Sequence, residues 1–223
     1  MLIAVLTAMQ KEHDAISVLL SDVRTETHGR FTYTCGRLAS SAVVLRQCGI
    51  GKVNAAVGTA ELIRTYHPSA VVSTGVAGGL TEGVGVMETV VSSRLVQHDF
   101  DLTPLGTPRG QIDDLPRFFE ADARLLSKVP ANTHIGLIAS GDQFIATPQQ
   151  REQILTHFPE ALAADMESAA IAQACYLYGV PFISFRTLSD APGAESHTQQ
   201  YEHFWETLAE RSFETTRQFL LSI

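Results

Sequence analysis

The sequence predicts one α/β domain over residues 1–223, with a central mixed but mostly parallel β-sheet flanked by helices. The first observation behind this prediction is that short β-branched runs alternate with longer helical segments along the chain. The second is composition, since 45% of the residues are apolar and 18% are charged, as in ordered globular proteins. The third is length, because 223 residues can bury one sizeable core, and no repeat or linker divides them.

The first part of the chain predicts three strands, two of them in a hairpin. Leu2–Thr7 is an apolar run that predicts a buried strand, and Lys11–Leu20 predicts the helix after it. Phe31–Leu38 and Ser41–Gln47 predict the hairpin, because both runs are rich in strand-forming residues and only a short polar step separates them.

The next segment predicts a helix, a strand and a glycine turn. Lys52–Tyr66 predicts a helix that contains several alanines and a leucine, and we expect it to end at His67-Pro68 because proline cannot continue it. Ala70–Thr74 predicts a buried strand that closes in a turn at Gly75-Val76-Ala77-Gly78-Gly79.

The remainder of the chain predicts further strands and two helices. The strands are expected at Thr89–Leu95, Thr133–Ala139 and Pro181–Thr187, and the helices at Asp165–Tyr178 and Gln200–Leu221. Between them, the segment from His98 to Pro116 is the longest irregular stretch. Loops of that length in a compact domain usually cover a site or an interface.

Charge and cysteine content exclude several classes of protein. A net charge of −8 and a pI near 5.4 argue against a nucleic-acid backbone or an anionic membrane as the main partner. Three cysteines without CxxC spacing predict neither a disulfide framework nor a zinc knuckle. The apolar run at the N-terminus is too short for a signal peptide or a membrane span, so we expect a cytoplasmic protein.

No motif predicts a metal, a dinucleotide or a covalent intermediate. His98-Asp99 and the pair His197 and His203 lack a metal-ligand spacing, and we expect these histidines on the surface or in loops. The glycine segments match neither the phosphate-loop pattern nor the GxGxxG fingerprint. Ser140 lacks the GxSxG elbow of serine hydrolases. The sequence therefore predicts no metal and no cofactor.

Four polar or small segments directly follow predicted strands. They are Glu12, the glycine turn, Ser140-Gly141-Asp142, and Asp190. Ligands of open α/β sheets bind beyond the carboxyl ends of strands, so these segments are expected to converge on one pocket. The alternative is that small and acidic residues here only end strands and cap helices.

Six motifs together resemble one family of enzymes, and they appear in its order and spacing over nearly the whole chain. They are Ala8-Met9-Gln10-Lys11-Glu12, Gly49-Ile50-Gly51-Lys52-Val53, Thr74-Gly75-Val76-Ala77-Gly78-Gly79-Leu80, Ser140-Gly141-Asp142-Gln143-Phe144-Ile145, Asp165-Met166-Glu167-Ser168-Ala169-Ala170 and Leu188-Ser189-Asp190. The resemblance is to the 5′-methylthioadenosine/S-adenosylhomocysteine nucleosidases, within the nucleoside phosphorylase superfamily. It implies a nucleoside phosphorylase-like fold and a hydrolase that releases adenine from 5′-thio-substituted nucleosides.

The resemblance implies roles for the acidic residues. Glu12 resembles the carboxylate that orients and deprotonates the attacking water, and Asp190 resembles the acid that assists departure of adenine through N7, with Ser189 orienting it. Glu167 resembles the residue that holds the 2′- and 3′-hydroxyls of the ribose, beside Met166. Because the reaction develops a cation on the sugar and negative charge on the purine, carboxyls in different protonation states suit it.

The remaining implied contacts surround the base and the 5′-substituent. Phe144 and the backbone of Ile145 resemble the adenine clamp, and Met9 and Ile50 resemble the lining of the 5′ pocket. An apolar thioether suits such side chains better than a hydrogen-bonding cradle. Other positions expected to line the substrate are Val76 and Gly78 of the glycine turn, Asp165, Leu105, and either Tyr201 or Phe204 from the last helix.

Some of these positions depart from the family's pattern. Asp165 stands where many relatives carry glutamate, Val76 where some carry serine, and Leu105 where an aromatic residue is common. The family usually forms homodimers in which the loop at 98–113 completes the partner's 5′ pocket, and Leu105 and Ile112 are apolar enough for that. The resemblance thus implies a homodimer and leaves the preferred 5′-group open.

Three alternatives remain at this point. The first is a purine nucleoside phosphorylase, which shares the fold but needs a cationic pocket to bind phosphate. The first loop of this chain offers Glu12 instead. Arg46 and Arg186 are expected to serve packing or ion pairs within strands. A non-catalytic nucleoside-binding protein could keep the fold. Finally, Leu95–Asp99 and Ile138–Phe144 resemble members that also process 6-amino-6-deoxyfutalosine in menaquinone synthesis, which leaves open whether that role or methionine salvage dominates.

Overall fold

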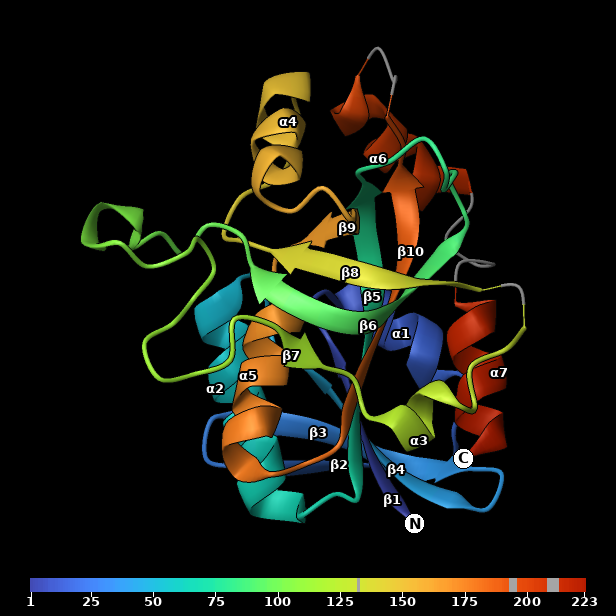
Figure 1. Ribbon diagram of the computed structural model, residues 1–223. Coiled ribbons are helices and arrows are strands. Elements are labelled where there is room, and N and C mark those ends of the chain that lie inside the picture. The colour runs from blue at the N-terminus through green and yellow to red at the C-terminus, as the bar shows by residue number, and fades with distance from the viewer. Residues whose placement is uncertain (132, 193–195, 208–212) are drawn as a thin grey trace.

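The computed structural model describes residues 1–131, 133–192, 196–207 and 213–223. Figure 1 shows the arrangement of the helices and strands. The strands are β1 (Leu2–Thr7), β2 (Ser21–His28), β3 (Phe31–Leu38), β4 (Ser41–Gln47), β5 (Ala70–Gly79), β6 (Thr89–Gln97), β7 (Phe119–Glu120), β8 (His134–Ser140), β9 (Ala161–Asp165) and β10 (Phe182–Asp190). The helices are α1 (Gln10–Ser17), α2 (Lys52–Tyr66), the 3₁₀ turn η1 (Thr103–Leu105), α3 (Ala123–Leu126), α4 (Pro148–His157), α5 (Ser168–Tyr178), α6 (His197–Thr207) and α7 (Glu214–Ser222).

The sheet closes on itself at one end and is open at the other. Its strand order is β10-β6-β8-β9-β5-β1-β4-β3-β2, and β10 pairs with β5 as well as with β6, which closes a ring of β5, β10, β6, β8 and β9. The remaining strands extend from β5 as an arm that ends at β2. The closed ring brings the ends of strands far apart in sequence to one rim.

The sheet is mixed, as predicted, but the prediction that it is mostly parallel is not confirmed. The described pairings divide equally between parallel and antiparallel. The antiparallel pairs include the predicted hairpin of β3 and β4 and its extension to β2. They also include the pairs of β9 with β5 and of β10 with β6, which close the ring.

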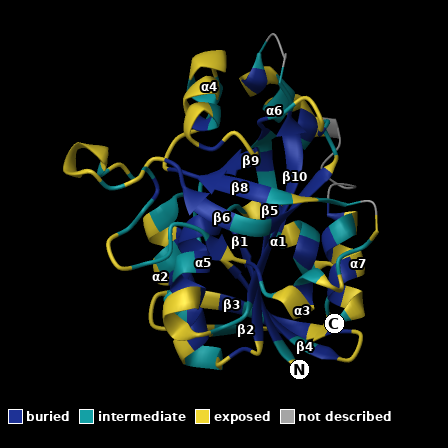
Figure 2. Cartoon of the chain, in the orientation of Figure 1, coloured by how far each residue is buried: buried dark blue, intermediate teal, exposed yellow. Residues whose placement is uncertain are grey.

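Helices cover the two faces of the sheet around continuous apolar clusters. Figure 1 shows α2 and α5 on one side and α1 and α7 on the other. Leu62 of α2 and Ile171 of α5 pack in the first core cluster, whereas Ile16 of α1 and Phe219 of α7 pack in the second. Figure 2 shows the ring strands largely buried and the exposed residues on the outer faces of the helices and on the loops. Within the described residues, no helix combines the length and apolarity needed to cross a bilayer.

Several predicted element boundaries differ from those of the structure. The segment Gly75–Gly79 is not a turn but continues β5, because it pairs with both β10 and β9. Asp165 ends β9 and α5 begins only at Ser168, so the helix predicted from Asp165 was placed three residues too early. The predicted helix over Gln200–Leu221 corresponds to α6 and α7, and residues 208–212 lie outside the described part of the chain.

The outermost strand, β2, has no apolar pattern that would predict it. Seven of its eight residues are exposed, so no alternation of buried side chains marks it in the sequence. Its charged residues include Asp22, Arg24 and Glu26, and the pairing with β3 shifts in register between Ser21 and Arg24. The strand exists because β3 offers it an edge to pair with.

The end of α2 follows the prediction closely. His67 closes the helix in the left-handed region, at φ 48°, and its N–H donates to the carbonyl of Ile63. Pro68 follows and cannot extend the helix. The chain then enters β5 directly at Ala70.

We expect Gly58→Ala to destabilise the protein, although alanine is the better helix former. A Cβ at Gly58 in α2 would lie 2.8 Å from the Cβ of Cys48, which neither backbone can easily relieve. Overpacking of this kind costs about 1–3 kcal/mol and exceeds the helix-propensity gain of about 1 kcal/mol. Denaturant unfolding measures the change. Gly83→Ala, whose Cβ meets no atom within 4 Å, is the matched control, and an equal or higher stability of Gly58→Ala would contradict the packing argument.

Candidate active site

A cavity lies at the rim of the closed ring where the ends of β1, β5, β8, β9 and β10 meet. The predicted convergence of these strand ends is therefore seen in the structure, although Ser140–Asp142 only lead into the wall that Gln143–Ile145 form. The lining residues are Ala8, Met9, Glu12, Ile50, Val76, Ala77, Gly78, Gln143, Phe144, Ile145, Ala164, Asp165, Met166, Glu167, Ser189, Asp190 and Tyr201. All but two of the positions expected at the site are among them.

The two exceptions are Phe204 and Leu105. Phe204 does not line the cavity: it is fully buried in α6 and packs edge-on against Trp205, with ring centroids 5.4 Å apart. Tyr201, one turn earlier, supplies the aromatic wall from this helix instead. Leu105 lies in η1 on the loop that projects from the body at the left of Figure 1, with 78% of its surface exposed, and does not reach this chain's own cavity.

Glu12 is held by three main-chain amides. Its Oε2 accepts hydrogen bonds from the N–H groups of Ala8 at 2.9 Å and Met9 at 3.0 Å, and its Oε1 accepts one from Val76 at 3.1 Å. The side chain is buried, and burial raises the pKa of its carboxyl, while the positive charge of Arg186 and the amides act in the opposite direction. The carboxylate is therefore fixed in direction without being paired directly to a cation.

Glycine at position 75 is required by the close approach of Glu12. A Cβ at Gly75 would lie 2.6 Å from Oε1 of Glu12, which is closer than any real contact. The glycine motif read as a turn thus serves another purpose: it gives β5 a flat surface against which a carboxylate can lie. Gly78, in the same strand as Gly75, lies beside Asp190, but a Cβ there would lie 3.4 Å from its Oδ2, an ordinary van der Waals contact, so glycine is not required at that position.

Asp190 ends β10 and carries a hydrogen bond on each oxygen. Ser189 Oγ donates to Oδ1 at 2.9 Å, and Nδ1 of His197 lies 2.7 Å from Oδ2. Burial raises the pKa of the Asp190 carboxyl, and His197 and Ser189 oppose that rise. The expectation that His197 lies on the surface or in a loop is wrong, because the ring is buried at the start of α6. His98 is buried as well, but it lies in the turn directly after β6 and is therefore in a loop, as expected.

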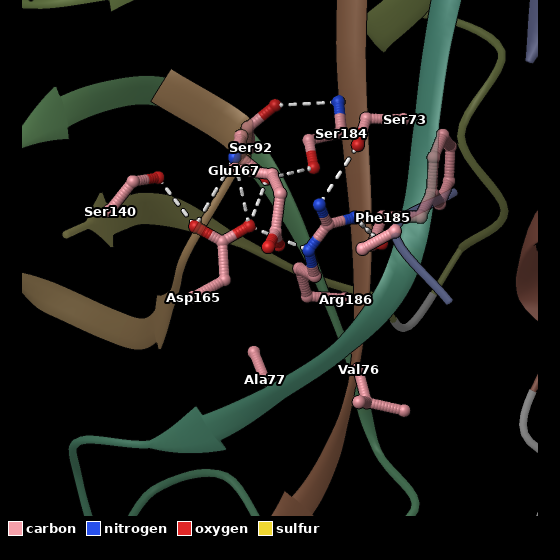
Figure 3. Close-up of polar contacts among 12 residues, drawn as sticks. Ser73, Val76, Ala77, Ser92, Ser140, Asp165, Glu167, Ser184, Phe185 and Arg186 are labelled. Atoms are coloured by element: carbon pink, nitrogen blue, oxygen red, sulfur yellow. Dashed lines mark hydrogen bonds and ion pairs between the residues drawn. The ribbon is translucent and has the colours of Figure 1, made fainter. Parts of the chain in front are cut away.

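Glu167, Asp165 and Arg186 form a buried charged cluster, drawn in Figure 3. Nε of Arg186 donates to Oδ2 of Asp165 at 2.7 Å, and its Nη2 donates to Ser73 Oγ at 2.9 Å. Asp165 also accepts hydrogen bonds from the hydroxyls of Ser140 and Ser168. The prediction that Arg186 serves an ion pair within a strand is confirmed.

Glu167 is left with its carboxylate directed to the cavity. Its Oε1 accepts one hydrogen bond, from the N–H of Gly51 at 2.9 Å. Burial, together with the nearby negative charge of Asp165, raises the pKa of Glu167 to about 7, against an ordinary value of 4.5. The carboxyl therefore exchanges a proton near neutral pH.

The apolar wall of the cavity is built from Phe144, Tyr201 and Met9. The rings of Phe144 and Tyr201 meet edge to face, with centroids 5.5 Å apart, and the Tyr201 hydroxyl lies 3.4 Å from the Met9 sulfur. Phe144 is 43% exposed, so its face is available to a planar ligand. The site thus combines one apolar side with a carboxylate-lined side.

Comparison with known proteins places this arrangement in a family. The profile described as the phosphorylase superfamily matches residues 2–221. A nucleosidase of Hydrogenovibrio crunogenus named 5′-methylthioadenosine/S-adenosylhomocysteine nucleosidase is 39% identical over 204 residues, 88% of each chain. One of the same name from Maridesulfovibrio salexigens is 39% identical over 95% of each chain. The chain belongs to the 5′-methylthioadenosine/S-adenosylhomocysteine nucleosidase family.

Solved structures of the nucleosidase family agree with this membership. The enzyme from Neisseria meningitidis, solved in complex with methylthio-immucillin-A, has a TM-score of 0.92 and 35% identity, covering 100% of this chain and 99% of that one. The enzyme from S. pneumoniae, solved with a transition-state inhibitor, also has a TM-score of 0.92, at 34% identity. The predicted nucleoside phosphorylase-like fold is therefore confirmed.

Charge distinguishes this nucleosidase cavity from a phosphate site. Glu12, Glu167 and Asp190 all line it, and no lysine or arginine appears among its described lining residues. Arg186 lies behind the carboxylates, buried and committed to Asp165 and to the carbonyl of Phe185. A dianion would meet repulsion here without a compensating partner.

Sequence reasoning missed two contributors to the nucleosidase site. His197 had no motif to mark it, because its partner Asp190 lies seven residues away on another element. The N–H of Gly51 could not be assigned to Glu167, since a backbone donor leaves no trace in residue identity. The positive φ of Gly51, 93°, does require glycine, so the glycine itself was the available signal.

We expect Glu167→Gln to raise the Tm at about pH 8 and to leave it nearly unchanged at about pH 5. The folded protein keeps a proton on Glu167 up to about pH 7, whereas the unfolded chain loses it near 4.5. This group's contribution to stability is therefore present at low pH and lost as the pH rises from 4.5 to 7. Glutamine cannot ionise and avoids that loss.

Calorimetry at the two pH values measures the effect. Each kcal/mol gained in the free energy of unfolding should raise the Tm by about 2–4 °C. The exposed Glu152→Gln is the control and should show no such dependence on pH. A Tm gain for Glu167→Gln of equal size at both pH values would mean that the ionisation of this carboxyl is not the cause.

Proposed function

We propose that this chain hydrolyses the N-glycosidic bond of 5′-methylthioadenosine and S-adenosylhomocysteine and releases adenine. The chain belongs to a family of nucleosidases, which are hydrolases that act on N-glycosyl bonds. The single observation that carries the proposal is that Glu12, Glu167 and Asp190 line one cavity whose other side is apolar. A ribose between these groups would have an acid on its base side and a base on its other face.

Asp190 acts as the general acid in this proposal. Departure of adenine leaves negative charge on the purine, and a proton delivered to N7 neutralises it. The raised pKa of Asp190, caused by burial, favours the protonated form that such a role needs. Ser189 and His197 hold the two oxygens in place, so that the carboxyl is oriented before the substrate arrives.

Glu12 acts as the general base. It holds water against the anomeric carbon and accepts a proton from it as the new C–O bond forms. The three amides that donate to Glu12 stabilise its ionised form and leave lone pairs free for the water. Arg186 adds long-range positive charge that lowers the pKa of Glu12 against the effect of burial.

Glu167 binds the 2′- and 3′-hydroxyls, and its negative charge stabilises the cationic sugar of the transition state. Met166 contacts the ribose beside it. Phe144 stacks on adenine, and the backbone of Ile145 reads the edge of the base. Val76, Gly78 and Asp165 complete this part of the lining.

The 5′-substituent lies against Met9, Ile50 and Tyr201 in this proposal. These side chains are apolar or present an apolar face, which suits a thioether. Ile50 is 52% exposed, so this end of the cavity is open to solvent and leaves room for groups of different length. We therefore include 5′-deoxyadenosine and 6-amino-6-deoxyfutalosine among its substrates and propose a role in methionine salvage, menaquinone synthesis or both. Relative kcat/KM values across the four nucleosides test this breadth.

We further propose that the enzyme is a cytoplasmic homodimer. The loop at 98–113 projects from the body, and Leu105 on it is 78% exposed. Val53 in α2, three residues after Ile50 of the cavity lining, is 73% exposed. Apposition of two copies would cover both and bring Leu105 to the partner's 5′ pocket. All three cysteines are free, which suits a reducing compartment. Sedimentation equilibrium tests the dimer, and full activity from a strict monomer would contradict the shared pocket.

Phosphate is expected to have no effect on the reaction. With methylthioadenosine as substrate, the products should be adenine and free methylthioribose, formed at the same rate with and without phosphate. The reason is the carboxylate-lined cavity, which has no cation to hold a dianion. Product analysis by chromatography measures this. A ribose 1-phosphate product that depends on phosphate would favour the phosphorylase alternative, and adenine binding without turnover would favour a non-catalytic protein.

We expect Asp190→Asn to lower kcat by at least ~10²-fold, because asparagine keeps the shape of the side chain but cannot give a proton. A spectrophotometric assay of adenine release measures the loss. Asp14→Asn, an exposed carboxyl on the same helix as Glu12, serves as control and should keep full activity. Activity of Asp190→Asn within a few-fold of the parent would remove this residue as the acid.

A further inference from the structure

Two glycine-containing sequence motifs lie against each other beside the cavity. The turn Gly49–Lys52 leads into α2, and Gly141-Asp142 follow β8, which ends at Ser140. Gly49 and Gly51 both have φ near +90°, in the region that only glycine adopts readily. This backbone geometry directs consecutive N–H groups of the turn toward carboxylates from other segments.

Helix α2 lacks a capping side chain of its own, and Asp142 replaces it. The N-cap residue is Gly51, which has no side chain to accept a hydrogen bond. Oδ1 of Asp142 instead accepts the N–H of Lys52 at 2.7 Å, across 90 residues of sequence. A Cβ at Gly51 would lie 3.1 Å from that oxygen, so the turn also makes room for it. A carboxylate at a helix N-terminus is favoured by the helix dipole.

Asp142 is itself held in place from the other side. Its N–H donates to Oδ2 of Asp99 at 2.9 Å, and Oδ1 of Asp99 accepts from Nζ of Lys52 at 2.6 Å. Nζ of Lys52 donates as well to Oε1 of Gln97 at 3.2 Å. Lys52 is thus fixed at both its backbone and its side chain, and Asp99, Lys52 and Asp142 close a ring of interactions.

These interactions of Asp99, Lys52 and Asp142 also affect the position of Glu167. The residue before Lys52 is Gly51, whose N–H donates to Oε1 of Glu167 at 2.9 Å. Two consecutive amides therefore donate to two different carboxylates. The N–H of Gly51 donates to Glu167, and the N–H of Lys52 donates to Asp142. Loss of the Asp142 acceptor would free the start of α2 to shift and would misdirect the donor that orients Glu167.

We propose that Asp142 is a positioning residue that orients Glu167 toward the ribose by fixing the turn at Gly49–Lys52. The inference rests on the proposed function of Glu167 as the ribose-binding carboxylate. Asp142 lies outside the cavity lining and acts only through the turn. Adenine, held at Phe144 and Ile145, does not depend on this arrangement.

The experiment compares Asp142→Ala, Asp142→Asn and a matched control in nucleoside hydrolysis and in adenine binding. Asp122→Ala is the control, because Asp122 also caps a helix by accepting from two backbone amides but lies away from the cavity. For Asp142→Ala we expect kcat/KM for methylthioadenosine to fall about 10-fold, in line with the loss of one charge-assisted hydrogen bond. The inhibition constant of the product adenine should stay unchanged.

Asp142→Asn retains an acceptor oxygen and should restore most of the activity, and Asp122→Ala should match the parent. An unchanged kcat/KM for Asp142→Ala would overturn the proposal. A parallel weakening of adenine binding would also overturn it, because the whole cavity would then have lost its shape. If the parent protein itself fails to release adenine from methylthioadenosine, the proposed function fails instead, which keeps the two outcomes apart.

Discussion

The site depends on one buried guanidinium. Arg186 lies behind the cavity, 2.7 Å from Asp165, and its charge reaches Glu12 and Glu167 as well. Burial of several carboxylates so close together is costly unless positive charge and hydrogen bonds compensate them. Because Arg186 is placed behind the lining and not in it, the carboxylates can face the cavity while the cation stays out of reach of a ligand. Burial raises the pKa values of Glu12 and Glu167, and the positive charge of Arg186 opposes that rise without making the cavity attractive to anions.

Most members of the site could be predicted from the sequence, because Glu12 and Asp190 follow strands and the motifs keep a known order. The closure of the ring could not, since it requires β10 to pair with both β5 and β6, and pairing partners leave no mark in local composition. Phe204 and Tyr201 are three residues apart on α6, and only packing decides which of them faces the ligand. His197 was missed because its function comes from a neighbour, not from a motif.

The glycines around the site share one physical purpose. Because Gly75 has no side chain, the carboxylate of Glu12 can pack against β5. Gly51 likewise leaves space for the carboxylate of Asp142. A phosphate loop uses glycine to bring backbone amides to an external anion. Here the amides meet anions that belong to the protein, which explains why the glycine segments match no nucleotide-binding fingerprint. The backbone organises the acidic residues before any substrate is present.

The open end of the sheet has a consequence for the behaviour of the protein at high concentration. An unpaired strand edge is a template for association with other chains. The edge strand β2 alternates charges along an exposed surface, and its register with β3 slips near Ser21. A second copy adding a strand there would have to desolvate those charges and follow an irregular backbone. The arm can therefore end in solvent without promoting fibrillar aggregation.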